Sequence, residues 1–282
     1  GEKGLLKTEL SFGRSDNISR AIEDIAYRRG FGDEMAEGVR YLAEKYGGQE
    51  FAIHSKGLEL AAYEPRGAVG HGLGYAVSNR GGCHLSGGYV IFFEANGPIT
   101  VDPYTTVGKP GLVAFNQIAL EAISTLGSCS FTAYVAAPKE LLSLYSKSRL
   151  VSSIVNLTFT RGGNFIGKML YSPKMLPDAF FNLSFPHIKA HALCTGSKFT
   201  AVDFFKLGQR VNNISRLFNV REGFTSADDS LPDRLTRELQ RAEEPRSRVP
   251  LDEMLPTYYK LRGWTEEGVP TKRTLELLEI ET

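Results

Sequence analysis

Ser78-Asn79-Arg80-Gly81-Gly82-Cys83-His84 is the stretch of this 282-residue sequence that says most about the fold. It places a thiol and an imidazole side by side on a glycine-rich segment, where the backbone can take conformations and close approaches that other residues disfavour. A second cysteine follows in Leu126-Gly127-Ser128-Cys129-Ser130-Phe131, beside a glycine and just past a run with helical spacing. Two cysteines cannot hold a metal cluster alone, so the other ligands would have to come from elsewhere.

The composition is that of an ordinary globular protein, with 42% hydrophobic and 23% charged residues. The 33 basic and 32 acidic residues nearly cancel, which gives no electrostatic case for binding nucleic acid or an acidic membrane surface. No apolar run approaches the roughly 18 residues of a membrane-spanning helix, and the amino terminus lacks the features of a signal peptide. Three widely spaced cysteines fit a reducing compartment better than a disulfide framework. We therefore expect a cytoplasmic protein with neither nucleic acid nor membrane as a partner.

Helical periodicity dominates the chain. Asp16 is expected to cap a helix that stops at Gly30, and a second helix is expected to follow Asp33. Further helices are predicted over about 111–126, after a cap at Thr200, over about 251–262, and from Thr271. The predicted apolar faces are Ile18, Ala21, Ile22, Ile25 and Ala26 in the first helix, Met35, Val39, Leu42 and Tyr46 in the second, and Phe204, Leu207, Val211, Ile214 and Phe218 after Thr200.

The glycine-dense residues 63–88 are predicted to be irregular and to form the functional centre. Gly70, Gly72 and Gly74 do not follow the GxGxxG pattern, and no Walker lysine accompanies them, which argues against a nucleotide-binding loop. Close approach of helices or backbone around a cavity explains these glycines better. Residues 234–248 are rich in charge and are predicted to be a surface excursion or loop.

Together these blocks resemble one family, the tungsten-dependent aldehyde ferredoxin oxidoreductases. The resemblance covers nearly the whole chain in the family's order, through blocks at 26–32, 56–60, 65–67, 78–84, 126–129, 208–210, 217–224, 229–232 and 258–264. Residues from about 145 to 186 match nothing in the family, and we predict that they are an insertion. The resemblance implies an all-α fold of irregular multi-helical bundle domains of the family's carboxy-terminal type. Residues 1–52 would be a remnant of the family's middle domain, and residues 53–282 the helical carboxy-terminal domain.

In that family the carboxy-terminal domains close over a tungsten held by two pterin cofactors, and a four-iron (4Fe-4S) cluster relays electrons to ferredoxin. The resemblance implies that Cys129 is the fourth cysteine ligand of this cluster. It also implies that His84 lies near the tungsten and donates a proton to the substrate oxygen. From the residues alone, His84 could instead be bonded to backbone in a tight loop, and Cys129 could be a buried thiol after a helix. The family's other cluster cysteines, in a CxxCxxxC arrangement, and its amino-terminal pterin-binding domain are not found in this sequence.

The segment before Cys129 departs from the family pattern. The family's motif opens with an aspartate that binds a pterin and has leucine before the cysteine, whereas this chain has Ser124 and Ser128. Serine cannot offer a bidentate carboxylate to a pterin ring, which puts pterin binding by this chain in doubt. The resemblance nevertheless assigns cofactor contacts to this loop, at Ser124, Gly127, Ser128 and Ser130.

The other cysteines and histidines are predicted to be structural. Cys83 is expected to be a small packing residue and Cys194 a structural one. His54, His71, His187 and His191 lack the spacing of zinc ligands and are expected at the surface or in packing. Asp228 and Asp229 could pair on a metal, but an acidic turn before Leu231-Pro232 is the commoner case.

The predicted function is therefore the carboxy-terminal part of a tungstopterin and iron–sulfur aldehyde:ferredoxin oxidoreductase. It would oxidise an aldehyde to a carboxylic acid, pass electrons to ferredoxin, and form one wall of the cofactor and substrate cavity. The isolated chain is expected to be inactive and to carry no cofactor. Its expected partner is the amino-terminal cofactor-binding half, from the same gene or as a separate subunit. The alternative is a non-catalytic helical interaction or scaffold subunit derived from the family. A divided cavity also predicts an open apolar face at residues 67–88 and around Cys129, with possible self-association.

Overall fold

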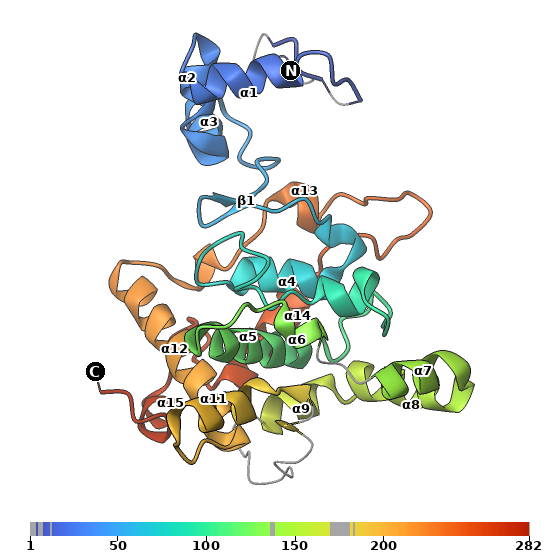
Figure 1. Cartoon of the computed structure of the whole chain (residues 1–282). Helices are drawn as coiled ribbons and strands as arrows, with labels where there is room; N and C mark the ends of the chain where they lie inside the picture. The colour runs from blue at the N-terminus through green and yellow to red at the C-terminus, as the bar shows by residue number, and fades with distance from the viewer. Residues whose placement is uncertain are drawn as a thin grey trace.

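The computed structural model describes residues 4, 8–11, 13–135, 139–169, 181–182 and 184–281. Helices form nearly all of its regular structure (Figure 1), which confirms the predicted helical fold class. The sheet within these ranges is a two-stranded hairpin in which β1 (His54–Ser55) pairs antiparallel with β2 (Leu58–Glu59). No helix of the described part is long and apolar enough to cross a membrane.

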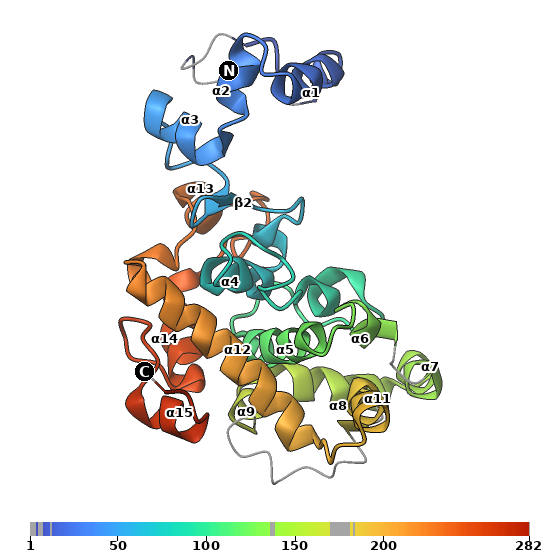
Figure 2. The same ribbon diagram turned by 60° about the vertical axis from the view of Figure 1, so that its left-hand side comes forward.

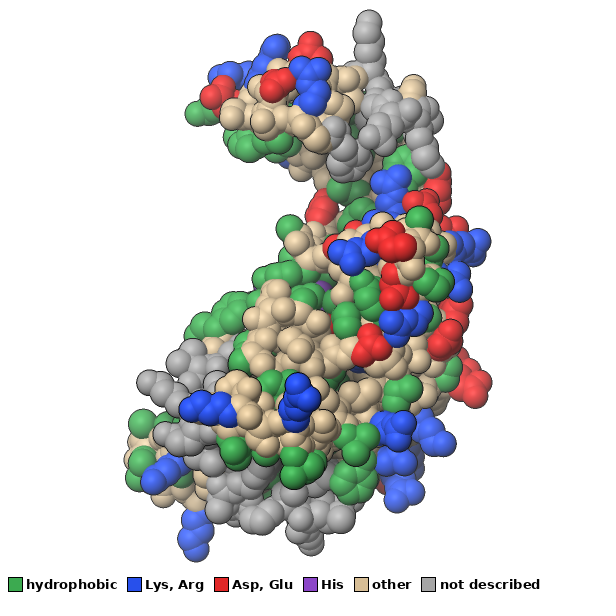
Figure 3. All heavy atoms as spheres, turned by 90° about the vertical axis from the view of Figure 1, so that its right-hand side faces the viewer, with side chains coloured by type: hydrophobic (Ala, Val, Ile, Leu, Met, Phe, Trp, Pro, Cys, Tyr) green, Lys and Arg blue, Asp and Glu red, His purple; other side chains and the backbone are tan. Residues whose placement is uncertain are grey.

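The first three helices form a small unit that stands apart from the body of the molecule (Figures 1 and 2). They are α1 (Ile18–Ala26), α2 (Phe31–Met35) and α3 (Gly38–Tyr46). Figure 3 shows a notch between this unit and the rest. No residue of α1 is buried, and Ile22 is 61% exposed, so the predicted apolar face of this helix lies on the surface.

The predicted start and the predicted end of the first helix are both wrong. Asn17, not Asp16, is the N-cap, and it makes no side-chain capping bond. The helix ends at Ala26, before Gly30, because Arg28 takes a left-handed conformation with φ of 51°. The positive φ of Gly30, 53°, then sets the entry into α2.

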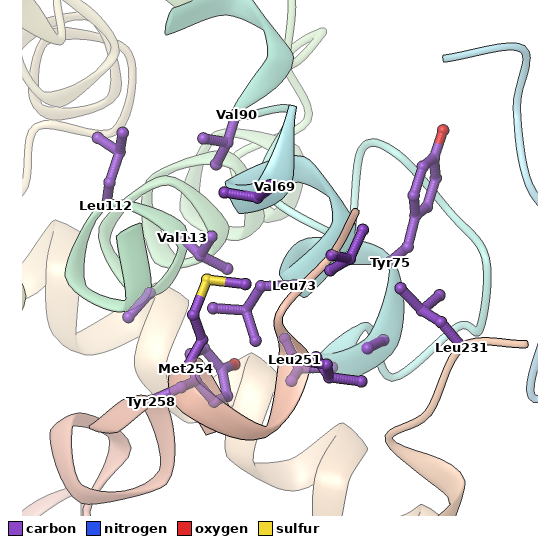
Figure 4. Packing of buried hydrophobic residues seen from close by; sticks show 14 of the residues in the cluster. Val69, Leu73, Tyr75, Val90, Leu112, Val113, Leu231, Leu251, Met254 and Tyr258 are labelled. Atoms are coloured by element: carbon purple, nitrogen blue, oxygen red, sulfur yellow. The ribbon is translucent and has the colours of Figure 1, made fainter. Parts of the chain in front are cut away.

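The body is built around α5 (Lys109–Thr125), which is buried along most of its length. Around it pack α4 (Val69–Val77), α9 (Gly163–Met169), α12 (Ala201–Arg221) and α14 (Leu251–Arg262). Figure 4 shows Val69 and Leu73 of α4 meeting Val113 of α5 and Met254 of α14 in one apolar cluster. A second cluster joins the rest of α5 to α12, and it contains Ile118, Ile123, Phe181, Phe204 and Phe205.

Residues 63–88, predicted to be irregular, contain the short helix η1 (Pro65–Gly67) and the fully buried α4. The amino end of α4 is capped from outside, because the Glu94 carboxylate accepts hydrogen bonds of 2.8 Å from the backbone of Gly70 and of His71. Glu94 lies in η2 (Phe92–Asn96), a single π-helical turn, and forms a buried ion pair with Lys109. This remote cap compensates for the poor helix propensity of the glycines in α4.

Those glycines are explained by close packing, as predicted. A Cβ atom at Gly72 would lie 2.7 Å from a Val249 methyl, and one at Gly74 would overlap the backbone of Gly87. At the crossing of α5 and α12, a Cβ at Gly208 would overlap the Ile118 carbonyl oxygen.

The longest helix, α12, confirms the predicted cap but not the predicted face. Thr200 and Asp203 form a reciprocal capping box at its start. Phe204 is buried, but Ile214 and Phe218 are 48% and 55% exposed. The buried face instead carries polar side chains farther along the helix, and these are Gln209, Asn212, Asn213 and Arg216.

The polar groups on the buried face of α12 form ion pairs and hydrogen bonds with residues distant in sequence. Arg216 pairs with Asp229 and donates to the Gly268 carbonyl at 2.8 Å. Asp229 also pairs with buried Lys56 at 2.8 Å and accepts a bond of 2.6 Å from Tyr259. Asp229 is thus held by protein cations, which contradicts a metal pair and fits a structural role.

The remaining helices lie at the periphery. They are α6 (Thr132–Val135), α7 (Lys139–Lys147), α8 (Arg149–Thr160), α11 (His187–Thr195), η4 (Ser226–Asp228), α13 (Asp233–Thr236) and α15 (Lys272–Leu277). The predicted surface character of residues 234–248 is confirmed, since most are exposed turns. The predicted insertion at 145–186 includes α8 and α9, and its residues 170–180 and 183 lie outside the described residues. The insertion and the domain boundary at residue 53 stay predictions.

Candidate active site

The segment Ser78–His84 rests on the β hairpin. The Gly82 amide donates to the Ser55 carbonyl at 3.1 Å. A Cβ at Gly81, where φ is +84°, would lie 2.6 Å from that same carbonyl oxygen. The two glycines are therefore needed to bring this loop against the hairpin.

Asparagine side chains fasten the same segment to α12. Asn79 donates to the Asn212 carbonyl at 3.0 Å, and Asn219 donates to the Asn79 carbonyl at 2.8 Å. The Ser78 hydroxyl donates to the Ser86 hydroxyl at 3.0 Å, which closes the loop across its base. His84 is thus presented on a segment fixed at both ends.

Two tyrosines flank His84. Its ring centroid lies 5.6 Å from that of Tyr63 and 5.7 Å from that of Tyr89, and the two tyrosine hydroxyl oxygens are 3.2 Å apart. Burial lowers the pKa of His84, so the neutral imidazole is favoured. Burial, reinforced by the hydrogen bond to Tyr63, raises the pKa of Tyr89. The arrangement is a neutral imidazole flanked by two tyrosine rings, and its unprotonated ring nitrogen can accept a proton.

His71 lies behind this group. Its side chain is 0% exposed, and its ring centroid lies 4.4 Å from that of Tyr75 in a tilted contact and 5.5 Å from that of Tyr63 in an edge-on contact. Neither ring nitrogen has a hydrogen-bond partner within the described part of the chain. Burial, with a smaller contribution from the neighbouring His84, lowers the pKa of His71 to about 3. His71 is therefore a neutral packing ring at neutral pH, as its sequence context suggested.

The Cys129 loop follows the end of α5. Gly127 turns the chain with φ of +78°, and the Ser124 and Ser130 hydroxyls are 2.8 Å apart across the loop. The Ser128 hydroxyl lies 3.4 Å from that of Thr132, at the start of α6. Cys129 is a free, exposed cysteine within this closed turn.

Phe131 connects the two halves of the candidate site. Its ring packs edge-on against Tyr89 with centroids 5.2 Å apart. Because Tyr89 also contacts His84, the fold brings the histidine segment and the cysteine loop into one neighbourhood. All the predicted site residues lie on these two segments: His84 on the first, and Ser124, Gly127, Ser128, Cys129 and Ser130 on the second.

The donor groups of the loop fit some parts of the implied cofactors better than others. An exposed thiol is a suitable soft ligand for an iron–sulfur cluster. The described residues contain no group of three or more His, Cys, Asp or Glu placed to hold a metal. Toward a pterin, the loop offers the paired hydroxyls of Ser124 and Ser130 and the open backbone at Gly127, beside which a Cβ would meet nothing within 4 Å.

The surface around the site differs in part from the prediction. The predicted open face is wrong for residues 68–78, which are all buried beneath neighbouring segments. By contrast, Cys129 is exposed and Phe131 is 44% exposed. Cys194 is also exposed and Cys83 is half-buried, so neither belongs to the apolar core.

Sequence reasoning missed Tyr63, Tyr89 and Phe131 as members of this group. Tyr63 precedes the Glu64-Pro65 turn and Tyr89 follows Gly87-Gly88. Tyr63 and Tyr89 thus lie at the edges of glycine and proline turns on either side of the histidine segment. This position is the sequence signal that could have identified them.

Comparison with known proteins agrees with the helical fold class. Residues 1–280 match the family described as aldehyde ferredoxin oxidoreductase, domains 2 and 3. The tungsten-containing aldehyde ferredoxin oxidoreductase of Pyrococcus furiosus is 37% identical over 99% of this chain, and that of Thermococcus kodakarensis is 36% identical over 98%. The chain spans about 40% of the length of these curated relatives. A solved structure of the active site complex BamBC of benzoyl coenzyme A reductase aligns with 99% of this chain and 41% of its own, with 18% identity and a TM-score of 0.47.

Proposed function

Because this chain belongs to the aldehyde ferredoxin oxidoreductase family, as its carboxy-terminal domains 2 and 3, we propose that it forms one wall of the active site of a tungsten enzyme that oxidises aldehydes. The observation that carries the proposal is the contact of Phe131 with Tyr89, which joins the His84 group to the exposed Cys129 loop. A proton-transfer group and a metal-ligating thiol thus share one neighbourhood. The amino-terminal region that precedes this part in the relatives would supply the remaining ligands.

His84 is proposed to transfer the proton in the reaction. Oxidation of an aldehyde with water gives a carboxylic acid, two electrons and two protons. The neutral ring favoured by burial accepts one of the two protons from the attacking water, as the water oxygen bonds to the carbonyl carbon and the carbonyl π electrons move to the substrate oxygen. The aldehyde C–H bond then breaks, its electron pair would pass to the bound cofactors, and its proton is released to solvent. In the reverse direction the protonated ring donates to the substrate oxygen. The rings of Tyr63 and Tyr89, whose hydroxyl oxygens are 3.2 Å apart, flank the His84 ring.

Cys129 is proposed to bind the iron–sulfur cluster as one of its four thiolates. The bound tungstopterin and cluster would take up the two electrons of the reaction and deliver them to ferredoxin. The hydroxyl groups of Ser124, Ser128 and Ser130 and the backbone at Gly127 would face the pterin from the same loop. Because no carboxylate lies in this loop, we propose that the pterin here is held by neutral hydrogen bonds.

The test uses the complete enzyme, prepared without oxygen and assayed with an aldehyde and a viologen dye. His84→Asn removes the titrating group, and we expect a loss of turnover of roughly 100-fold with tungsten and iron contents unchanged. His191→Asn, at a half-buried position on α11, is the matched control and should retain full turnover. Full activity of the His84 variant would remove it from the mechanism.

The serines at positions 124 and 128 favour a second candidate function, a non-catalytic subunit that has kept the fold. This alternative predicts that the complete protein contains neither tungsten nor iron after anaerobic preparation. Stoichiometric metal would exclude it.

A further inference from the structure

The α7–α8 hairpin has a charge that sets it apart from the rest of the molecule. Residues 139–169, from the start of α7 to the end of α9, contain five basic residues and one acidic one, Glu140, although the whole chain has a net charge of only +1. The remaining residues are therefore net acidic. In the described part of this stretch, Lys147, Arg149, Arg161 and Lys168 are all exposed, and no ion pair to them is found among the described residues.

The same hairpin exposes large aliphatic side chains in a regular stripe. Along α8, Leu150, Ile154 and Leu157 are 70%, 54% and 53% exposed and follow the spacing of one helix face. The opposite face of α8 is half-buried, and Phe159 on it stacks on Phe93 of η2 with centroids 5.2 Å apart. The helix is therefore fixed against the protein by one face and presents the other to solvent. Arg149 and Arg161 stand at the two ends of the exposed stripe.

The hairpin lies close to the Cys129 loop in the chain. Cys129 is followed directly by α6, and α7 begins at Lys139. Figures 1 and 2 both show α7 and α8 projecting from the body on the side where α6 lies. A protein bound to this face would thus lie on the side of the molecule where α6 follows the Cys129 loop.

We propose that the exposed face of the α7–α8 hairpin is the docking surface for a small acidic electron-carrier protein. This inference rests on the proposed function, because a reaction that releases two electrons needs an acceptor that can approach the cluster. An apolar stripe with arginines at its rim is a common composition for an interface with a protein of opposite charge. The local positive field would also orient such a carrier as it approaches.

An anionic membrane is the competing occupant of a basic amphipathic surface. The structure favours a protein, because α8 offers only three large aliphatic anchors on its solvent face. Membrane-surface helices rely on a larger apolar face buried at the headgroup boundary.

The experiment compares two acceptors with the complete enzyme. The double variant Arg149→Glu with Arg161→Glu reverses the rim charges, and Lys272→Glu with Arg273→Glu makes the same charge change on α15, on the opposite side of the molecule in Figures 1 and 2. With an acidic four-iron ferredoxin at low salt, we expect the KM of the hairpin variant to rise by about tenfold or more, with less salt dependence than the wild type. The control should stay within about twofold of the wild type, because distant exposed charges contribute little. With methyl viologen, both variants should keep the wild-type rate.

A second variant and a lysine-acetylation footprint test the same docking surface. Together they make the test independent of the folding of one variant and of turnover. Leu150→Gln with Ile154→Gln removes apolar contact without changing charge and should also raise the KM for ferredoxin. Acetylation of Lys147 and Lys168, followed by mass spectrometry, should be rapid in the complete enzyme and slowed when ferredoxin is added.

Several results would overturn the proposal. One is an equal KM for ferredoxin in the hairpin and control variants. Another is protection of Lys147 without ferredoxin, since the face would then be covered within the enzyme. A third is binding to vesicles of phosphatidylserine and phosphatidylcholine that the hairpin variant abolishes while its ferredoxin KM is unchanged. Absence of viologen activity in the wild type would instead refute the proposed function itself.

Discussion

At the scale of single residues, His71 predicts a specific pH dependence. Burial lowers its pKa from 6.5 to about 3 in the folded chain. Between about pH 3 and pH 6.5 the unfolded chain therefore binds a proton at His71 that the folded chain does not. The contribution of His71 to the free energy of unfolding should therefore be constant above about pH 6.5. Below that pH the free energy of unfolding should fall by about 1.4 kcal/mol per pH unit. At about pH 4.5 the loss from this residue is about 3 kcal/mol. Urea unfolding at several pH values measures it.

His71→Phe should remove that decline, because an aromatic ring remains against Tyr75 without a titrating nitrogen. His191→Phe, at a half-buried position, is the control and should keep the wild-type slope between about pH 4.5 and 6.5. An unchanged slope in His71→Phe would assign the pH dependence to other groups.

Lys109 predicts the cost of breaking the buried pair that caps α4. Lys109→Met leaves the Glu94 carboxylate buried with only the backbone donors of Gly70 and His71. We expect the free energy of unfolding to fall by about 3–5 kcal/mol. Lys272→Met, at an exposed position, should change it by less than about 0.5 kcal/mol. A loss below about 1 kcal/mol would mean that the amides alone satisfy Glu94.

At the residue level, the sequence motifs selected candidates but left their contacts open. His84 and Cys129 were selected by the blocks around them, and the fold does bring their segments together through Phe131 and Tyr89. Tyr63 and Tyr89 were missed, because their partnership depends on a contact across 26 residues of chain that no local pattern encodes. The chemical roles of His84 and of the cysteine loop stay predictions.

At the scale of elements, the crossing of α5 and α12 depends on one glycine. Gly208→Ala would place a Cβ, fixed to the backbone of α12, on the Ile118 carbonyl oxygen of α5, and neither atom can move without its helix. The free energy of unfolding should fall by about 1–3 kcal/mol, because inserted atoms force the two helices apart. Gly67→Ala is the control, since its Cβ would meet only Gln240 at 3.6 Å. Equal midpoints of urea unfolding for the two variants would show that the crossing tolerates the methyl group.

Element boundaries were predicted well where caps are local. Thr200 and Thr271 cap their helices through their own side chains, and both starts were read from sequence. The helix α4 was missed because its cap, Glu94, comes from another segment and its glycines suit close packing. The face of α12 was mispredicted because Arg216 and Asn213 are buried by remote partners, Asp229 and Trp264. An apolar periodicity rule assigns such residues to the surface.

At the scale of the whole molecule, the exposed apolar surfaces are consistent with a part of a larger assembly. The chain spans about 40% of its curated relatives, and α1 and α8 each expose a row of large aliphatic side chains. Patches of this kind on a soluble protein mark interaction sites. Self-association of the isolated chain stays a prediction, and it follows from the same surfaces.

The iron content of the complete enzyme tests the central claim most directly. We would replace Cys129 by serine and, as the matched control, replace Cys194, which is also an exposed free cysteine. Both proteins would be prepared without oxygen and analysed for iron and for the spectrum of a four-iron cluster. The account predicts that Cys129→Ser loses most of its iron or shows an altered cluster spectrum, while Cys194→Ser matches the wild type. Equal iron and identical spectra in both variants would contradict it, and Cys129 would then be an ordinary surface thiol.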